Sequence, residues 1–238
     1  MKATHNYIIM KYWRLYNSAE KEVGFVPQIV EPVFEGYYTD DNQLLNKFSK
    51  QIENNTIIPK GHLHKRAKLT DLMSVGFGSG DFFLSDKLRI IIELFPFMGV
   101  QFVSTQIITN IGEFVKSNIM HSFSTDRSFI DMANTEFEIS TVGGELLNDR
   151  LKFSSMKDFM EIREAHIAES KKYKDIKFHK WITISKLSFK EDVDFGLCSI
   201  FDIKFGGLGF FVSQQLKDEI LINKCTGVIF REINESYP

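Results

Sequence analysis

Hydrophobic and polar residues follow the same order in two stretches of this chain, residues 82–102 and residues 210–230. The stretches align without a gap at a constant offset of 128 residues, and eight of the 21 positions are identical. Each begins with two phenylalanines and an aliphatic residue, which favours a strand. A serine suited to capping a helix follows, and a glycine with a Val-x-Phe run closes the stretch. We therefore expect two related repeats, each a strand, a helix and a second strand.

The apolar spacing inside each repeat predicts how its helix is buried. In the first repeat, four apolar residues share one helical face: Leu88, Ile91, Ile92 and Phe95. In the second repeat, Leu216 and Ile220 keep this face but Glu219 interrupts it, so we expect the second helix to be less deeply buried. Gly99 and Gly227 stand where a helix commonly takes a left-handed residue just after its end.

Aromatic and β-branched residues predict further strands around the repeats: 7–16, 136–141, 145–153, 181–189 and 197–205. Gly143-Gly144 lies between two of these segments and favours a hairpin turn. Ser155 and Asp158 resemble a capping box that opens a helix running to about residue 173. Four apolar residues are expected on its inner face: Met156, Phe159, Met160 and Ile167. Apolar spacing also predicts a helix near 42–53, and the polar, basic residues 54–68 predict a loop.

The chain has no stretch rich in serine, proline and glycine that would divide it into domains. We therefore expect residues 1–238 to form a single α+β domain with two pseudo-repeat halves. Its helices are expected to pack against mixed sheets.

Composition narrows the class of protein. Apolar residues make up 43% and charged residues 25%, as in soluble globular proteins. The net charge is −2, from 29 basic and 31 acidic residues, so we expect no nucleic-acid partner. No apolar run approaches the roughly 18 residues of a membrane span, and the run Tyr7–Met10 is too short for a secretion signal. Two cysteines, Cys198 and Cys225, are too few for a disulfide framework. We expect a cytoplasmic protein.

Two histidines raise the possibility of metal chemistry. His62 and His64 lie two residues apart, and Asp71 would supply a third ligand for a metal-dependent hydrolytic enzyme. Lys65 and Arg66 oppose this interpretation, because cations beside imidazoles disfavour a bound cation. A solvated basic loop is the alternative, and it leads us to expect no metal and no cofactor.

Two further motifs have structural explanations that we prefer. Residues 76–80 are rich in glycine, but Asp81 and a strand follow where a phosphate-binding loop would open onto a helix. Ser85 and Ser213 recur in both repeats without the G-x-S-x-G surroundings of a nucleophile elbow, and they occupy cap positions. A flexible turn and two helix caps are therefore expected, and we expect no catalytic residue.

Two acidic and aromatic clusters are candidates for binding a protein partner, since aromatic residues beside charges are typical of interface hot spots. The first cluster comprises Tyr37, Tyr38, Asp40 and Asp41. The second comprises Glu191, Asp192 and Asp194. The structural alternatives are a capped helix start and a polar connector between strands.

Two blocks of residues resemble a known family. The first contains Lys68–Ser74, Phe83–Leu88 and Gly99–Phe102, and the second contains Phe201–Ile203, Phe211–Leu216 and Thr226–Phe230. In order and spacing they are similar to immunity proteins of bacterial polymorphic toxin systems, of the immunity-protein-43 type and its close relatives. Those families carry a "T-D-L-x-S" block and a C-terminal "T-G-V-x-F" block. Here Met73 and Ser74 fill the last two places of the first block.

The resemblance implies a cytoplasmic protein that neutralises a cognate toxin domain by occlusion, without catalysis. The toxin would be encoded by the adjacent gene. The metal-dependent enzyme at His62 and His64 and a structural or scaffold subunit remain the alternatives. The oligomeric state and the activity of the toxin stay open.

Overall fold

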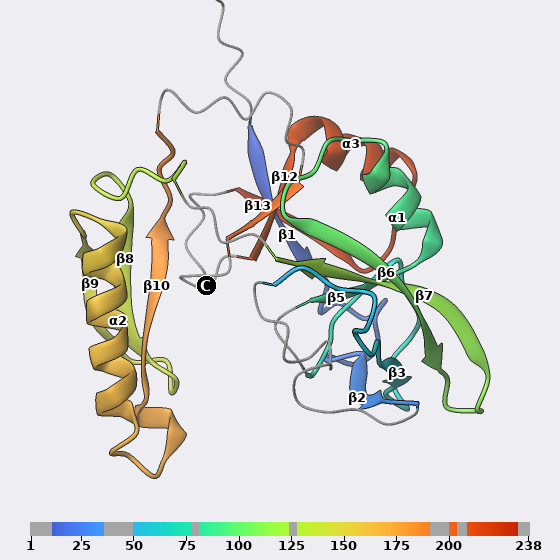
Figure 1. The fold of residues 1–238 in the computed structure, drawn as a ribbon. Coiled ribbons are helices and arrows are strands. Elements are labelled where there is room, and N and C mark those ends of the chain that lie inside the picture. The colour runs from blue at the N-terminus through green and yellow to red at the C-terminus, as the bar shows by residue number, and fades with distance from the viewer. Residues whose placement is uncertain are drawn as a thin grey trace, which may run out of the picture. The chain divides into compact units, whose positions relative to one another are not determined.

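The computed structural model describes residues 11–35, 50–77, 81–123, 128–190, 200–203 and 209–232. Its chain divides into two compact units (Figure 1). Unit 1 comprises Met1–Thr125, Phe195–Asp202 and Phe210–Arg231, and unit 2 comprises Asp126–Asp194, Ile203–Gly209 and Glu232–Pro238. Both repeats lie in unit 1. The expected single domain with two related halves stays a prediction.

The described part of unit 1 contains two sheets and two helices, which confirms the α+β class with mixed sheets. The first sheet has the strand order β2(Ile29–Val33), β3(Lys60–Leu63), β6(Val100–Ile108), β7(Phe114–Ser122), β5(Phe82–Leu84) and β4(Leu72–Met73). Its β3–β6 pair is parallel and its other pairs are antiparallel. The second sheet has the order β11(Ile200–Ile203), β12(Gly209–Ser213), β1(Tyr12–Asn17) and β13(Val228–Glu232). The helices are α1(Asp86–Glu93) and α3(Gln214–Ile222).

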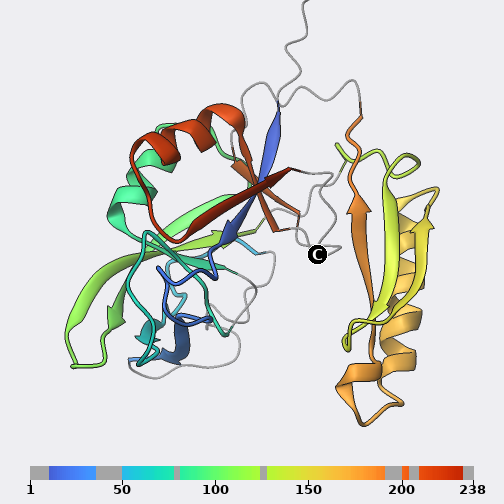
Figure 2. The same ribbon diagram turned by 180° about the vertical axis from the view of Figure 1, so that it is seen from behind.

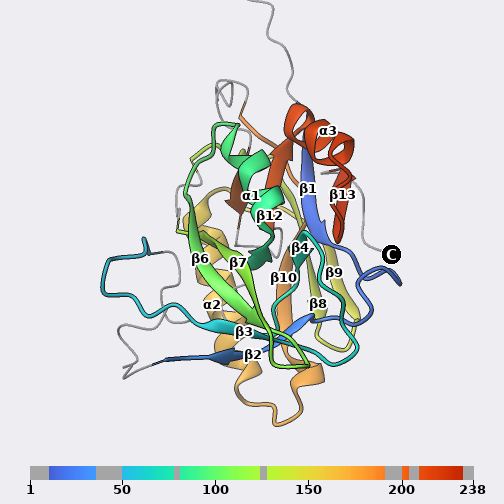
Figure 3. The same cartoon turned by 90° about the vertical axis from the view of Figure 1, so that its right-hand side faces the viewer.

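The two repeats have the same topology, which confirms the duplicated strand–helix–strand prediction. In the first repeat, β5 and β6 flank the central strand β7, and α1 connects them. In the second, β12 and β13 flank β1, and α3 connects them. Figures 1 and 3 show α1 and α3 side by side. Each repeat therefore needs a third strand from elsewhere in the chain to complete its sheet.

The two central strands occupy equivalent places. Phe83 of the first repeat pairs with Ile119 of β7, and its counterpart Phe211 pairs with Arg14 of β1. The Gly99 carbonyl accepts a hydrogen bond from the Phe123 amide (2.8 Å), just as the Gly227 carbonyl accepts one from the Ser18 amide (2.9 Å). The first repeat takes its central strand from the segment that follows it, whereas the second takes it from the N-terminal part of the chain.

One apolar core joins the two repeats. Its buried members come from both sheets and both helices: Leu15, Leu72, Leu84, Leu88, Ile91, Ile92, Val100, Met120, Phe210, Val212, Leu216 and Ile220. The rings of Phe82 and Phe210, which occupy the same place in the two repeats, lie 5.6 Å apart. Helix α1 buries three residues and α3 buries two, as the interrupted apolar face of the second helix predicted.

The two repeat glycines are left-handed, but not at the places expected. Gly99 and Gly227 have φ values of 66° and 75°. The helices already end at Glu93 and Ile222, so these glycines precede strands β6 and β13 instead of terminating helices. A Cβ on Gly227 would lie 2.3 Å from the Leu72 carbonyl oxygen, which shows that close backbone approach also requires a glycine here.

The loop expected at residues 54–68 is partly wrong, because Lys60–Leu63 form strand β3. This strand adds in parallel to β6, a long-range pairing that local polarity does not reveal. Of the helix predicted near 42–53, residues 42–49 lie outside the described residues and residues 50–53 are not helical. In the described part of the chain, no helix is long and apolar enough to cross a membrane.

The described residues of unit 2 form a three-stranded antiparallel sheet with a helix on one face. The strands are β8(Glu136–Thr141), β9(Leu146–Leu151) and β10(Lys180–Lys186), in the order β10-β8-β9. Helix α2(Met156–Ser170) and the 3₁₀ turn η2(Ile176–Phe178) lie between β9 and β10 in the chain. Figures 1 and 2 show α2 against one face of this sheet. The rings of Phe137, Phe153 and Phe159 meet in its core, with centroids 4.8 to 5.5 Å apart.

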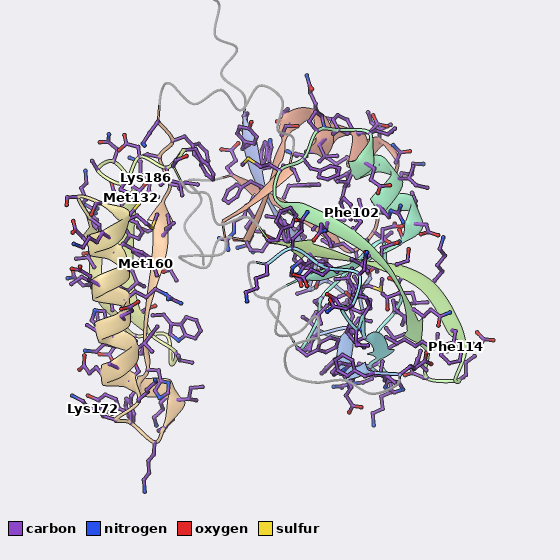
Figure 4. All side chains as sticks on the ribbon, viewed as in Figure 1. Phe102, Phe114, Met132, Met160, Lys172 and Lys186 are labelled. Carbon is purple, nitrogen blue, oxygen red and sulfur yellow. The ribbon has the colours of Figure 1, made fainter. Side chains whose placement is uncertain are left out.

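The predicted start of α2 is confirmed, and its predicted inner face is only partly buried. The Ser155 hydroxyl accepts a hydrogen bond from the Asp158 amide and caps the helix. Of the expected inner residues only Phe159 is fully buried. Met156 and Met160 are half-buried, and Ile167 is 39% exposed. Figure 4 labels Met160 on the helix. The second half of α2 therefore does not pack closely against the sheet.

Candidate functional site

The residues that carry the family resemblance meet at the joint between the two repeats. The Asp71 carboxylate accepts hydrogen bonds from the Ser85 hydroxyl (2.6 Å) and from the amide (2.8 Å) and hydroxyl (3.1 Å) of Thr226. Burial favours the neutral form of Asp71, but these hydrogen bonds and the nearby Lys87 outweigh it and hold the pKa of Asp71 below its ordinary value. Asp71 thus connects the helix cap of the first repeat with the turn that precedes β13.

A buried amide extends this joint. Gln28 is fully buried, and its side-chain nitrogen donates to the Lys68 carbonyl (2.7 Å) and the Thr70 hydroxyl (2.9 Å). Its side-chain oxygen accepts from the Asn17 side chain (2.9 Å) and the Ser74 amide (3.3 Å). Every hydrogen-bonding site of this amide is therefore used, as a buried polar group requires. Both motif blocks serve to hold unit 1 together.

The two repeat serines are helix caps, as predicted. The Ser85 hydroxyl accepts from the Leu88 amide at 3.1 Å, and the Ser213 hydroxyl accepts from the Leu216 amide at 3.2 Å. Of the glycine-rich stretch, residues 78–80 lie outside the described residues.

The two histidines of the metal hypothesis have other surroundings. His62 lies in β3, and the His64 ring stacks on Phe25 with centroids 3.7 Å apart. Desolvation, followed by the charges of Arg66 and Lys65, holds the pKa of His64 below its ordinary value. Asp71, the third ligand of that hypothesis, is bound to Ser85 and Thr226. Over the described ranges, no three His, Cys, Asp or Glu side chains gather in a way that could hold a metal ion.

The acidic and aromatic clusters predicted to bind a partner lie outside the described residues. This holds for the first cluster, Tyr37, Tyr38, Asp40 and Asp41, and for the second, Glu191, Asp192 and Asp194. Both remain predictions.

Unit 2 contains a pocket that the sequence patterns did not indicate. It has a volume of about 370 Å³ and lies between the second half of α2 and the beginning of β10. We call it the α2–β10 groove; its lining residues are Arg163, His166, Ile167, Ser170, Lys171, His179, Lys180, Trp181 and Ile182. The helical members are three or four positions apart, so they share one face of α2.

Strand β10 is an edge strand in the described part of unit 2. On its inner side, the His179 carbonyl accepts from the Val142 amide (2.9 Å), next to the pairing with β8. On its outer side, the Lys180 amide donates to the Ser170 hydroxyl (3.0 Å). Successive residues of a strand direct their amides to opposite sides, so the Ile182 amide points outward as the Lys180 amide does. The groove therefore runs beside an outward-facing strand backbone.

The groove is rich in positive charge. Glu169 receives two hydrogen bonds of 3.0 Å from the Lys180 ammonium. These hydrogen bonds hold the pKa of Glu169 below its ordinary value, although partial desolvation acts in the opposite direction. Among the described residues, no carboxylate lies within ion-pair distance of Arg163 or Lys171. The groove thus presents two cations whose charge is not neutralised there.

One exposed aromatic residue, Trp181, lines the groove together with these cations. Trp181 lines the groove and is 58% exposed, and Tyr173 and Phe178, with rings 6.1 Å apart, are also exposed. Exposed aromatic side chains beside cations are typical of interface hot spots. The sequence signal that could have found this site is local charge, since Ser170–Lys190 holds seven lysines and one acidic residue, Asp175.

No protein-family model matches the chain, and a search of curated proteins finds no match. The resemblance to immunity proteins therefore rests on the motif residues alone.

Proposed function

We propose that this protein binds a protein partner without catalysis, and that the partner is a cognate toxin domain that it neutralises by occlusion. The resemblance of the motif blocks to immunity proteins is the reason for naming a toxin. The observation that carries the binding role is the α2–β10 groove, where an edge strand, unneutralised cations and an exposed tryptophan occur together.

The motif residues of unit 1 have structural roles, which points to a binding surface formed by other residues. In unit 1 the motif residues are engaged in hydrogen bonds with one another, as the contacts of Asp71 with Ser85 and Thr226 illustrate. Large apolar side chains are exposed in both units, and those of unit 2 include Trp181, which lines the groove, with Phe178 and Ile176. A protein that acts by occlusion needs a sizeable contact, typically about 1,600 Å² in total. The groove would form one part of that contact.

Co-expression with the product of the neighbouring gene tests the proposal. The expected result is a stable complex on co-purification and survival of cells that express the toxin. Cells that die despite normal amounts of soluble protein, together with no complex, would contradict it. The separate acidic clusters can be tested in the same cells by alanine substitution at Asp40 with Asp41, and at Asp192 with Asp194.

The hydrolytic alternative at His62 and His64 makes a different prediction. It requires metal that co-purifies with the protein and a function that is lost in His64→Ala. Stoichiometric metal in the purified protein that is lost in His64→Ala would favour the metal-dependent enzyme and contradict the binding proposal. A scaffold subunit would form a complex with other proteins and give no protection against the neighbouring gene product.

A further inference from the structure

We propose that the α2–β10 groove binds an extended, acidic segment of a partner protein, which adds to the edge of β10 as a further strand. The identification of the partner as a toxin rests on the proposed function. The chemistry of the segment follows from the backbone and side chains of unit 2, and it can be tested separately.

The backbone of β10 supplies the first part of the argument. An exposed strand edge can pair with an extended peptide, whose main-chain hydrogen bonds supply affinity while side-chain pockets supply specificity. The Lys180 amide is already bound to Ser170, so pairing would start beyond it, at Ile182 and Ile184. Both isoleucines direct their side chains into the core, where the residues are 7% and 5% exposed. Their main-chain amides lie in the plane of the sheet and point to the open edge of β10.

The alternation of side chains supplies the second part. Trp181 borders the groove, but it and Thr183 direct their side chains to the face opposite to Ile182, because neighbouring residues of a strand point to opposite faces. Residues of an added strand share the face of the β10 residue beside them. A side chain next to Ile182 would therefore enter the groove, and a side chain next to Trp181 would lie against the indole. In the bound segment, side chains that enter the groove should therefore alternate with side chains on the opposite face, one of which packs against Trp181.

The charges of the groove determine which residues those are. Arg163 and Lys171 line the groove. The nearby Glu169 does not line it and is paired with Lys180. Complementary charge across an interface favours encounter and specificity. Acidic side chains are therefore expected in the groove and an apolar or aromatic side chain on Trp181.

A nucleic acid would also be attracted by cations and an aromatic ring, but two observations favour a peptide. The phosphates of a nucleic acid can only accept hydrogen bonds from the outward main chain of β10, whereas a peptide both donates and accepts along it. The whole chain has a net charge of −2, which opposes the approach of a densely charged phosphate backbone.

The test uses the full-length protein and a short amidated peptide in which glutamate alternates with valine, with one central phenylalanine. Binding is measured by calorimetry, and amide protection by hydrogen exchange of the isotope-labelled protein. We expect binding that weakens with added salt and slower exchange at the Ile182 and Ile184 amides. A control peptide with lysine at every glutamate should not bind.

Substitutions locate the site. The double variant Arg163→Glu/Lys171→Glu should weaken peptide binding at least about tenfold, because it replaces two attractions by two repulsions. The matched control is Lys172→Glu, which changes charge at the adjacent exposed residue at the end of α2 (Figure 4) that does not line the groove. This control should change affinity by less than about twofold. Trp181→Ala should weaken binding of the phenylalanine peptide more than that of an all-valine version.

Several results would overturn the inference. These are no binding of the glutamate peptide, binding that leaves exchange at Ile182 unchanged, equal loss in Lys172→Glu and in the double variant, or tighter binding of a single-stranded oligouridylate. Toxin protection by the double variant at wild-type level would overturn the groove as the contact but leave the proposed function intact. If the protein binds the peptide but gives no protection against the toxin, the proposed function is overturned and the inference about the groove stands.

Discussion

Asp71 and Thr226 lie 155 residues apart in the chain and exchange hydrogen bonds in both directions. The Thr226 amide donates to the Asp71 carboxylate at 2.8 Å, and the Asp71 amide donates to the Thr226 hydroxyl at 3.2 Å. Because Asp71 also accepts from the Ser85 cap, one side chain connects the first repeat with the second. Two sequence motifs that are distant in the chain are thus one structural joint.

Removing this carboxylate should destabilise unit 1. Asp71→Ala leaves the Ser85 hydroxyl and the Thr226 amide without their acceptor, and hydrogen bonds to charged groups contribute about 1.5–3 kcal/mol. We expect the free energy of unfolding to fall by about 2 kcal/mol in urea titrations followed by circular dichroism. Asp149→Ala, at an exposed position of β9, is the control and should change it by less than about 0.5 kcal/mol. Equal effects of the two substitutions would contradict a special role for Asp71.

The same residue makes stability depend on pH. The pKa of Asp71 is lower in the folded protein than its ordinary value of 3.8, so the unfolded chain binds this proton more readily. The stabilisation is therefore complete above the unfolded pKa and is lost as the pH falls through the folded pKa. Urea titrations between about pH 5 and pH 3 should show a smaller loss of stability in Asp71→Asn than in the wild type. Parallel pH profiles of the two proteins would refute this assignment.

Gly227 should tolerate substitution much less well than another left-handed glycine. In Gly227→Ala the new methyl group would lie 2.3 Å from the Leu72 carbonyl oxygen and 2.5 Å from the Thr70 hydroxyl, in addition to the cost of a φ of 75°. Gly112 has a φ of 81° and nothing within 4 Å of such a methyl group, so Gly112→Ala isolates the backbone cost. We expect a loss of about 1 kcal/mol at Gly112 and more than about 3 kcal/mol at Gly227. Thermal unfolding measures both losses. Similar losses of stability at the two positions would show that the neighbouring atoms move away from the new methyl group at residue 227.

Cys225 should be a slow nucleophile. Burial, with a smaller contribution from Asp71, raises the pKa of its thiol to about 11, so very little thiolate is present at neutral pH. In a Cys198→Ser background, the alkylation rate with iodoacetamide should be well below that of a free cysteine and should rise with pH beyond pH 9. Unfolding in urea should restore the ordinary rate. A fast reaction of the folded protein at neutral pH would contradict the burial of this thiol.

Features set by neighbouring residues could be predicted from the sequence. The caps at Ser85, Ser213 and Ser155 involve an amide three residues away, so the local pattern contains both partners. The hairpin at Gly143-Gly144 was predicted for the same reason. The burial of the inner face of α2 could not be predicted in this way. Apolar spacing shows which residues share a helical face, but it does not show how much of the sheet covers them. With three strands beneath it, α2 leaves Ile167 exposed and the groove open.

The duplicated strand–helix–strand unit and its serine caps could be predicted from the sequence, since hydrogen bonds within a few residues specify them. The left-handed conformation of Gly99 and Gly227 was also predicted, although these glycines precede strands and do not end helices. The tertiary structure was needed to show that β1 and β7 complete the two repeats, that Asp71 meets Thr226, and that Arg163 and Lys171 line one groove with residues of β10. Each of these depends on pairing between segments that are distant in the chain, and such pairings are selected by shared burial of apolar surface and by satisfaction of buried polar groups, which no single stretch of sequence contains.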